Sequence, residues 1–464
     1  MEKVAPTELG TQKISKLLAQ YALPAIIAMT AASLYNTVDS IFIGHGVGPY
    51  AIAGLALTFP LMNLSTAMGT LVGVGASTLI SILLGQRDYK MAQKVLGNSV
   101  SLNIIVGVVF AILALLFLDP ILEFFGGSEN TIPYARDYMI IILAGNVITH
   151  LYFGLNSILR VMGLPKKAMG ATIFTVVINS ILDPLFIFVF KWGIQGAAIA
   201  TVLSQFLAML YVIRLTSDKS RIVHLTTGIY GLQKNIIKKI FAIGMSPFLM
   251  NTCSCVIIIV LNQQLKKYGG DMAIGAFGIV QRLTFLILMT VLGLNQGMQP
   301  IAGYNYGAQK VDRVNEVLRK TIFFATIICC FGFVITEGFP STMARIFTKD
   351  QNLIDHAIRG IRISFIFIPI IGFQMVTSNF FQCIGMAKKA IFLSLSRQAI
   401  CLLPLLYILP LCLGHENGIY GVWWSLPLSD LISSIITAIL LQRQYKAFKT
   451  QHIQQLNLSE NGNA

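Results

Sequence analysis

About a dozen long apolar stretches run along the 464 residues of this chain, and they constrain its fold more than any other feature. A helix needs about 20 apolar residues to cross roughly 30 Å of hydrocarbon. Only 11% of the residues are charged, against about 25% in an average soluble chain. That is too little charge for a water-facing surface, so the sequence predicts an all-α polytopic membrane protein.

Scanning for runs of this length predicts twelve membrane spans, six in each half of the chain. The expected spans are 15–43, 51–84, 94–118, 132–160, 168–190 and 194–216, followed by 238–268, 272–305, 315–338, 353–384, 389–411 and 418–442. Several of them exceed the thickness of the hydrocarbon, which predicts tilted helices or helices that continue beyond it.

The basic residues predict how the spans are oriented. About 25 of the 34 Lys and Arg residues lie at the termini and in the even-numbered loops, whereas about eight lie in the odd-numbered loops. The positive-inside rule therefore places both termini in the cytoplasm. The net charge of +15 is spread in short clusters between apolar runs. Such a distribution is typical of cytoplasmic loops and disfavours a nucleic-acid-binding face.

The two halves carry matching positions at a nearly constant spacing of 222 to 225 residues. The matching pairs are 163–168 with 385–390, Pro24 with Pro247, 193–196 with 418–421, and Gly85 with Gly307. Because each repeat has six spans, both insert in the same orientation. This predicts two six-helix lobes related by a pseudo-two-fold axis normal to the membrane, with the substrate path between them. We expect an N-lobe at 1–216, a cytoplasmic linker at 217–237 and a C-lobe at 238–464.

Asp39 and Asp183 are carboxylates inside expected spans, where an ionised Asp costs about 2.5–3.5 kcal/mol. Asp39 precedes the outer end of the first span by about four residues, and Asp183 precedes that of the fifth by about seven. They would thus lie roughly 6 and 10 Å below the outer end, which permits a shared site. Asn179 is on the same helix face as Asp183, and Pro184 leaves the carbonyl of Ser180 without its helical donor. Oxygen ligands of this kind suit Na⁺ or can hold a proton.

Two more polar residues reach a comparable position. Thr201 lies about eight residues into the descending sixth span, and Tyr138 opens the fourth span from the outside. The alternative is structural: Asp39 would be an outer-end residue that reaches water, and Asp183 would bond a neighbouring helix. Asn179 and Thr201 also serve often as ties between helices.

Three other polar residues are candidates for the substrate cavity. Arg282 lies well inside the eighth span and needs a partner or a wet cavity. Asp430 occupies the position equivalent to Gln205 in the repeat, where it would be a second-lobe proton site or a polar tie. Asn156 lies near the inner end of the fourth span, where we expect it to line the cavity.

Several segments resemble the multidrug and toxic compound extrusion (MATE) family, within a larger superfamily of flippases and exporters. They are Leu34-Tyr-Asn-Thr-Val-Asp-Ser-Ile-Phe-Ile-Gly44, Gly297-Met-Gln-Pro-Ile-Ala-Gly-Tyr-Asn-Tyr-Gly307, Ser396-Arg-Gln398 and Gly421-Val-Trp-Trp-Ser-Leu-Pro-Leu-Ser-Asp430. The resemblance covers the whole chain and is strongest to the DinF-like and MepA-like branch.

This resemblance implies an antiporter of the bacterial plasma membrane that exports amphiphilic, cationic drugs or metabolites. It implies coupling to H⁺ or Na⁺, no cofactor, and a monomer as a sufficient unit. The cation network of the family would fall on Asp39, Tyr138, Asn179, Asp183 and Thr201. If the ion is Na⁺, its ligands would be Asp39, Asp183, Asn179 and Thr201.

Three rivals stay open at this point, and one of them is a channel, which would not concentrate a drug against a gradient. A flippase for a lipid-linked oligosaccharide would need a strongly cationic cavity, and Arg282 is its one candidate. A membrane-embedded enzyme would need a cluster such as HExxH or GxSxG, and the sequence contains neither. It also contains no GxxxxGK[ST] phosphate loop and no CxxC pair among its seven cysteines.

Overall fold

A computed structural model of the chain describes the backbone of residues 6–461. It describes the side chains of the same range except at 35–38, 40, 41, 44, 45, 49, 415, 416 and 449–461. The described chain is almost entirely helical, as the apolar runs predict. The first half contains η1 (Thr7–Gly10), α1 (Ile14–Gly46), α2 (Pro49–Gly85), α3 (Tyr89–Leu116), α4 (Leu118–Phe124), α5 (Ile132–Ala144), α6 (Asn146–Val161), α7 (Pro165–Pro184), η2 (Leu185–Val189) and α8 (Gly193–Thr216). The second half contains α9 (Lys234–Gly307), α10 (Val311–Gly338), α11 (Pro340–Arg345), α12 (Gln351–Ser364), α13 (Ile368–Cys383), α14 (Ala387–Leu395), η3 (Ser396–Leu402) and α15 (Leu403–Asn461).

Twelve membrane crossings can be traced through these helices. Within the described residues, nine helices are long and apolar enough to span a membrane, and the bent pairs α5–α6 and α12–α13 raise the number to eleven. The 74-residue α9 counts once among them, although a straight helix of that length would measure about 110 Å. Its backbone leaves the helical region at Gly270 (φ 67°, ψ −165°), where α9 turns back and so provides two crossings. The helices therefore agree with the twelve expected spans.

The segment between the two halves is slightly shorter than the sequence predicts. Helix α8 ends at Thr216, and α9 already begins at Lys234. Residues 234–237, expected in the linker, instead form the first turn of that helix. The connection between the last helix of the first half and α9 is thus 217–233.

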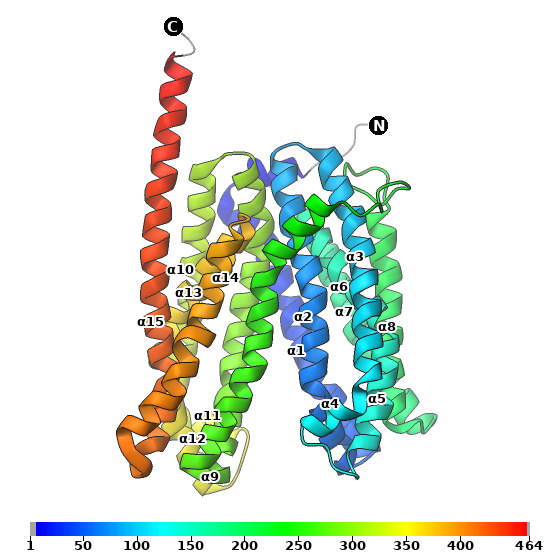
Figure 1. Cartoon of the computed structure of the whole chain (residues 1–464), viewed down its shortest axis with the longest axis vertical. Coiled ribbons are helices and arrows are strands. Elements are labelled where there is room, and N and C mark those ends of the chain that lie inside the picture. The colour runs from blue at the N-terminus through cyan, green and yellow to red at the C-terminus, as the bar shows by residue number, and fades with distance from the viewer. Residues whose placement is uncertain (1–5, 462–464) are drawn as a thin grey trace.

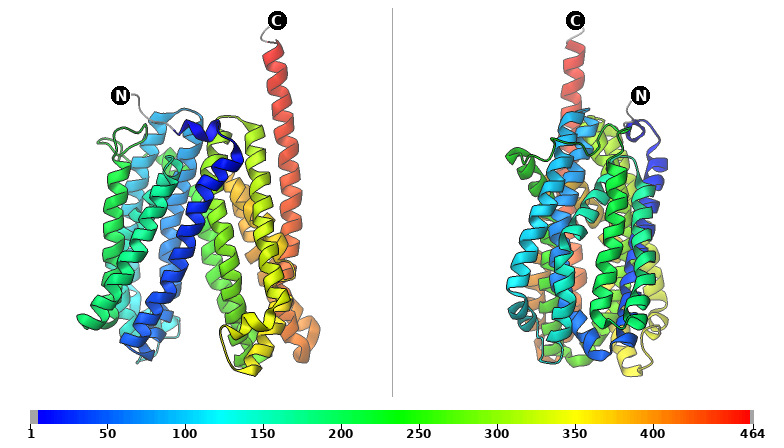
Figure 2. Two further views of the ribbon diagram at one scale, coloured as in Figure 1. Left: turned by 180° about the vertical axis from the view of Figure 1, so that it is seen from behind. Right: turned by 90° about the vertical axis from the view of Figure 1, so that its right-hand side faces the viewer.

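The helices form two bundles that lie side by side, one from α1–α8 and the other from α9–α15 (Figures 1 and 2). The two ends of the described chain lie at the same end of the molecule, which we call the terminal face (Figure 1). The short helices α4, α11 and α12 lie at the opposite face (Figure 1). An even number of crossings requires this arrangement of the ends.

Polar contacts join the two bundles near the terminal face. Gln299 of α9 donates through Nε2 to the hydroxyls of Ser77 and Thr78 of α2, at 2.8 and 2.9 Å. Ser81, one turn further along α2, donates to the carbonyl of Pro300 at 2.9 Å. Since these groups are buried, each bond also removes the cost of an unsatisfied polar atom. The contacts hold α2 against α9.

The buried apolar residues form two clusters that divide the core unequally. The larger cluster draws residues from both halves, such as Leu84 of α2 and Met298 of α9. The smaller cluster belongs to the first half alone and includes Leu118 and Leu122 of α4. The two bundles thus share one core, which in the second half also reaches α11 and α12 at the opposite face, whereas the first half has a separate core there.

A pair of glycines makes equivalent contacts between α2 and α9. A Cβ atom on Gly85 would lie 2.0 Å from the carbonyl oxygen of Tyr304, and one on Gly307 would lie 2.0 Å from that of Ile82. Tyr304 follows Ile82 by 222 residues, the spacing that also separates the two glycines. Each half therefore contributes the same glycine and the same carbonyl, as a two-fold axis requires. Only glycine permits so close an approach of two backbones.

Candidate functional site

Five polar residues that the sequence grouped together lie close to one another in the first half. Asp39 belongs to α1, Tyr138 to α5, Asn179 and Asp183 to α7, and Thr201 to α8. All five side chains are buried, from 0% exposure at Asp183 to 7% at Thr201. We call these five residues the carboxylate cluster.

Direct contacts connect the members of the carboxylate cluster. Asn179 donates through Nδ2 to Oδ1 of Asp183 at 3.2 Å and to Oγ1 of Thr201 at 3.4 Å. The Tyr138 hydroxyl lies beside the side chain of Thr201. Asp39 and Asp183 approach closely enough for their carboxyl groups to hydrogen-bond, which requires a proton on one of them. Four different helices thus meet at this one polar point.

Three oxygen atoms of the cluster are buried without a hydrogen-bond donor: Asp39 Oδ1, Asp183 Oδ2 and Asn179 Oδ1. Each such acceptor costs about 1–3 kcal/mol when it stays unsatisfied. A proton shared by the two carboxyl groups would satisfy acceptors on both aspartates, and a small hard cation can accept all three oxygens as ligands. The cluster is therefore chemically suited to take up and release either H⁺ or Na⁺.

The local backbone changes immediately after Asp183. Pro184 ends α7, and the next five residues form the π-helix η2. A proline removes one helical hydrogen bond, and π-helical turns often lie at functional sites because they bend or widen a helix. The acidic end of α7 therefore lies beside an irregular joint.

A polar stripe on α7 connects the carboxylate cluster with the centre of the molecule. Thr172, Thr175, Asn179 and Asp183 follow one another at spacings of three or four residues, so they share one helix face. At the other end of this stripe, Asn156 of α6 donates to Thr172 Oγ1 at 3.3 Å. A shift of α7 would therefore change the contacts at both ends of the stripe.

A cavity of about 360 Å³ lies between the two halves, and residues of both halves line it. Its polar lining is dominated by nine side-chain amides, and its apolar lining includes three methionines and one aromatic ring. The amides belong to Asn156, Asn251, Asn295, Gln296, Gln299, Gln374, Asn379, Gln382 and Gln398. Because Gln299 also bonds Ser77 and Thr78, the cavity ends where α2 and α9 close the terminal face.

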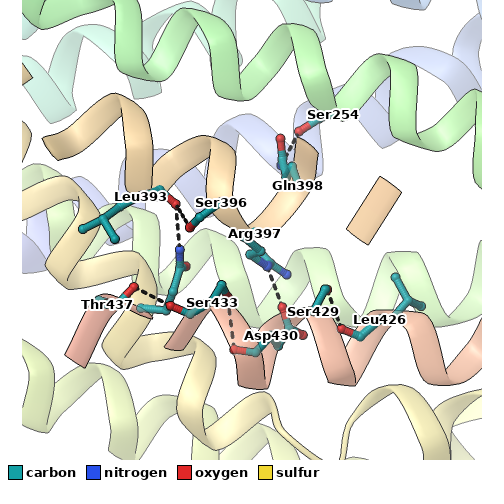
Figure 3. A network of polar contacts seen from close by, with 11 residues as sticks. Ser254, Leu393, Ser396, Arg397, Gln398, Leu426, Ser429, Asp430, Ser433 and Thr437 are labelled. Carbon is teal, nitrogen blue, oxygen red and sulfur yellow. Dashed lines mark hydrogen bonds and ion pairs between the residues drawn. The ribbon is translucent and has the colours of Figure 1, made fainter. Parts of the chain in front are cut away.

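An ion pair positions one charged residue of the cavity wall. Arg397 of η3 lines the cavity and donates through Nε to Oδ1 of Asp430 at 2.6 Å. Figure 3 shows Arg397 reaching from η3 to Asp430 of α15, while its neighbour Gln398 turns to Ser254. Asp430 is 5% exposed, so its charge is compensated inside the second bundle.

The structure places the three residues assigned to the substrate cavity differently from one another. Asn156 lines the cavity. Asp430 does not line it but holds Arg397, which does. Arg282 is also absent from the lining: its side chain is exposed, and its guanidinium lies 5.9 Å from the ring centre of Phe347. Its guanidinium thus faces an aromatic ring outside the cavity lining.

Sequence reasoning missed the two arginines that do line the cavity, Arg160 and Arg397. The expected eleventh span, 389–411, already contained Arg397, and that position was the available signal. Arg160 follows Asn156 by one helical turn, so both lie on one face of α6. It stands at the end of its span, where a basic residue looks like any other loop cation.

Comparisons with known proteins agree with this architecture. The MatE family model matches residues 24–185 and 242–408, and the second stretch begins 218 residues after the first (242 against 24). Over 430 residues the chain is 28% identical to the multidrug export protein MepA of Staphylococcus aureus, covering 92% of this chain and 93% of that protein.

Two solved structures are similar to it at 26% sequence identity. One is described as the outward-facing conformation of a multidrug resistance MATE family transporter of the MOP superfamily, with a TM-score of 0.90 over 97% of this chain and 100% of the other. The second is described as MATE in the bent conformation, with a TM-score of 0.91 over 97% of this chain and 99% of the other.

Proposed function

Because the chain belongs to the MatE family of membrane transporters, we propose that it exports small amphiphilic molecules in exchange for H⁺ or Na⁺ bound at the carboxylate cluster. The chain is a multi-pass drug-efflux transporter and not an enzyme.

The observation that carries the proposal is the set of three buried, unsatisfied oxygens in the carboxylate cluster. A purely structural polar tie would pair its acceptors, as nearly all buried polar groups do. Here Asp39 and Asp183 lie close to each other, and each keeps a buried acceptor without a donor. An ion that comes and goes accounts for this arrangement, since it supplies the missing positive charge in one state only.

The closed terminal face supports an assignment of the conformation. If both termini are cytoplasmic, as the positive-inside rule predicts, the contacts of α2 with α9 close the cytoplasmic side. The cavity would then communicate with the outside, past the far face where the two halves share no core. Similarity to a structure described as outward-facing agrees with this state.

In the proposed cycle, an external cation occupies the carboxylate cluster while the cavity faces outward. Its binding changes the packing of α7, and the stripe that ends at Thr172 and Asn156 transmits the change to the cavity, where affinity for substrate falls. The protein, which has released its substrate to the outside and still holds the cation, then turns inward. There it releases the cation and collects new substrate. The coupling is the difference between the affinities of cation and substrate for the two states.

A second candidate, a flippase for a lipid-linked oligosaccharide, gains support from one observation, the two arginines in the cavity wall. The volume of the cavity argues against a flippase. About 360 Å³ lies at the lower end of the range for sites that enclose a single drug-sized ligand. A pyrophosphate that carries several sugars would need considerably more room.

Dye efflux from energised cells that express the chain tests the proposal, with external pH and external Na⁺ varied independently. We expect efflux to follow one of the two cation gradients and to persist when ATP is depleted but that gradient is imposed. An ionophore that collapses the gradient should stop it. Efflux that depends on neither gradient would refute the proposal. So would efflux that stops when ATP is depleted while the cation gradient is maintained.

A further inference from the structure

We propose that the central cavity selects amphiphiles with an anionic head group, which Arg160 and Arg397 bind from opposite halves. This inference rests on the proposed export function and names its substrate class. It replaces the expectation of a cationic substrate, which came from family resemblance and not from any residue of the cavity.

The charges around the cavity all have one sign. Arg160 and Arg397 line it, and among the described residues no Asp or Glu does. The carboxylates of the first half, Asp39 and Asp183, are likewise absent from the lining. Even when Asp430 is counted as the partner of Arg397, Arg160 leaves the wall with a net positive charge. Such a wall repels a cation and attracts an anion.

The lining also lacks the usual means of binding an organic cation. Without a carboxylate, a cation in a protein site is held by aromatic faces, and Phe153 is the single ring in the described lining. Amide groups can solvate a cation through their oxygens, but they serve an anion equally well through their N–H groups. The amides therefore do not discriminate between cations and anions, and the two guanidinium groups determine that an anion is preferred.

Arg160 has free capacity for a ligand. It stands in the last turn of α6 and donates through Nη2 to Ser157 Oγ at 3.1 Å. Among the described residues, no carboxylate lies within ion-pair distance of it. A guanidinium carries five N–H donors in a planar fork that matches a carboxylate, phosphate or sulfonate. The negative end of the α6 dipole offsets its charge only in part.

Arg397 is held in place yet only partly engaged. Its described contact with Asp430 uses Nε alone, so the contact fixes the side chain without using the donors at the tip. Figure 3 shows the Asp430 contact on one side of the guanidinium, with another of its nitrogens lying away from that carboxylate. Because the cavity also contains Arg397, those remaining donors are available to a second acid.

The apolar lining completes the expected ligand. Met29 of α1, Met250 of α9 and Met375 of α13 line the cavity together with Phe153. Methionines adapt to irregular apolar shapes. An acid with a hydrophobic body would therefore bury its tail against these side chains while its head group meets the arginines. Since the arginines come from different halves, binding would also depend on how the halves are arranged.

Equilibrium binding of two matched fluorescent probes tests the inference. One probe carries a dansyl group on a carboxylate (a dansylated amino acid), and the other carries the same dansyl group on a trimethylammonium. The purified full-length protein is held in phosphatidylcholine nanodiscs. We expect the wild type to bind the anionic probe more tightly, and Arg160→Gln to weaken that binding about 10-fold to 100-fold, the range for a lost hydrogen bond to a charged group. Binding of the cationic probe should stay the same or tighten.

Arg282→Gln is the matched control, because this arginine lies outside the cavity lining and should leave both probes unaffected. Arg397→Gln combined with Asp430→Asn removes the second guanidinium without leaving a buried unpaired charge, and should also weaken the anionic probe. Tighter binding of the cationic probe by the wild type would overturn the inference. So would anionic binding that survives both cavity variants.

Two further arms separate related outcomes. In nanodiscs that contain phosphatidylglycerol, this lipid should displace the anionic probe if the natural acid is a lipid head group. If the natural acid is soluble, the lipid should not displace the probe. In both cases an anion binds at the arginines. The binding assay needs no ion gradient, so it is independent of coupling. Anionic binding without cation-dependent transport would refute the proposed function alone, and coupled transport with cationic binding would refute this inference alone.

Discussion

Replacing Asp183 or Asp39 with Asn should abolish most of the cation-driven efflux while substrate binding survives. Asn cannot take up a proton and offers Na⁺ no negative charge, so the buried acceptors of the cluster lose their ion. The cation then no longer favours one of the two states, outward-facing and inward-facing, over the other. Loss of a typical coupling free energy corresponds to a fall in cation-driven efflux of about 5-fold to 150-fold. Dye efflux under an imposed cation gradient measures the loss, with expression matched between variants.

The control for these variants is Asp355→Asn. Asp355 is an exposed carboxylate on α12 that accepts a hydrogen bond from Gln351 at 3.1 Å. Its replacement should leave efflux unchanged. Binding of a fluorescent substrate separates lost coupling from lost folding. Normal efflux by both cluster variants would show that the cation binds elsewhere, and Asp430 would be the next carboxylate to test.

Replacing Gly307 or Gly85 with Val should open the terminal face. A Cβ atom at either position would lie 2.0 Å from a backbone carbonyl oxygen, so α2 and α9 must separate. Overpacking of this kind costs about 1–3 kcal/mol, which shifts the ratio of closed to open molecules by about 5-fold to 150-fold. Cys383 reports the shift because it is buried, and its carbonyl lies 3.1 Å from a Cβ built on Gly303 of α9.

The measurement is the rate at which a maleimide labels Cys383 in a chain whose other cysteines are replaced by serine. Labelling should be faster in Gly307→Val than in the parent. Gly278→Val is the matched control, since Gly278 lies on the same α9 helix with no heavy atom within 4 Å of its Cβ position. Equal labelling of Gly307→Val and the parent would contradict the described closure, provided that both still bind substrate.

Much of this architecture could be predicted because a membrane simplifies the sequence signal. The need to satisfy every backbone group within the hydrocarbon leaves helices as the spanning element, so run length alone located the spans. Depth along a helix follows from residue counting, and this was sufficient to bring Asp39 and Asp183 together. Asn179 followed from the helical period, which puts residues four apart on one face.

Helix rotation could not be predicted in the same way. Arg282 and Arg397 both lie inside expected spans, yet only Arg397 lines the cavity. The rotation of a membrane helix depends on how it packs against its neighbours, and one sequence contains no record of that packing. The partner of Asp430 is hidden for the same reason, because Arg397 lies 33 residues earlier on another element.

Counter-movement of a cation in liposomes tests whether substrate export is an exchange for H⁺ or Na⁺ at the carboxylate cluster. Purified protein is reconstituted with a substrate gradient and no ion gradient, and trapped fluorescent indicators report H⁺ and Na⁺ in parallel. In a coupled exchanger, substrate moving in one direction drives one of these cations in the other direction, and we expect Asp183→Asn to eliminate the cation signal. Substrate movement without any cation movement, or with the cation travelling in the same direction, would contradict this exchange.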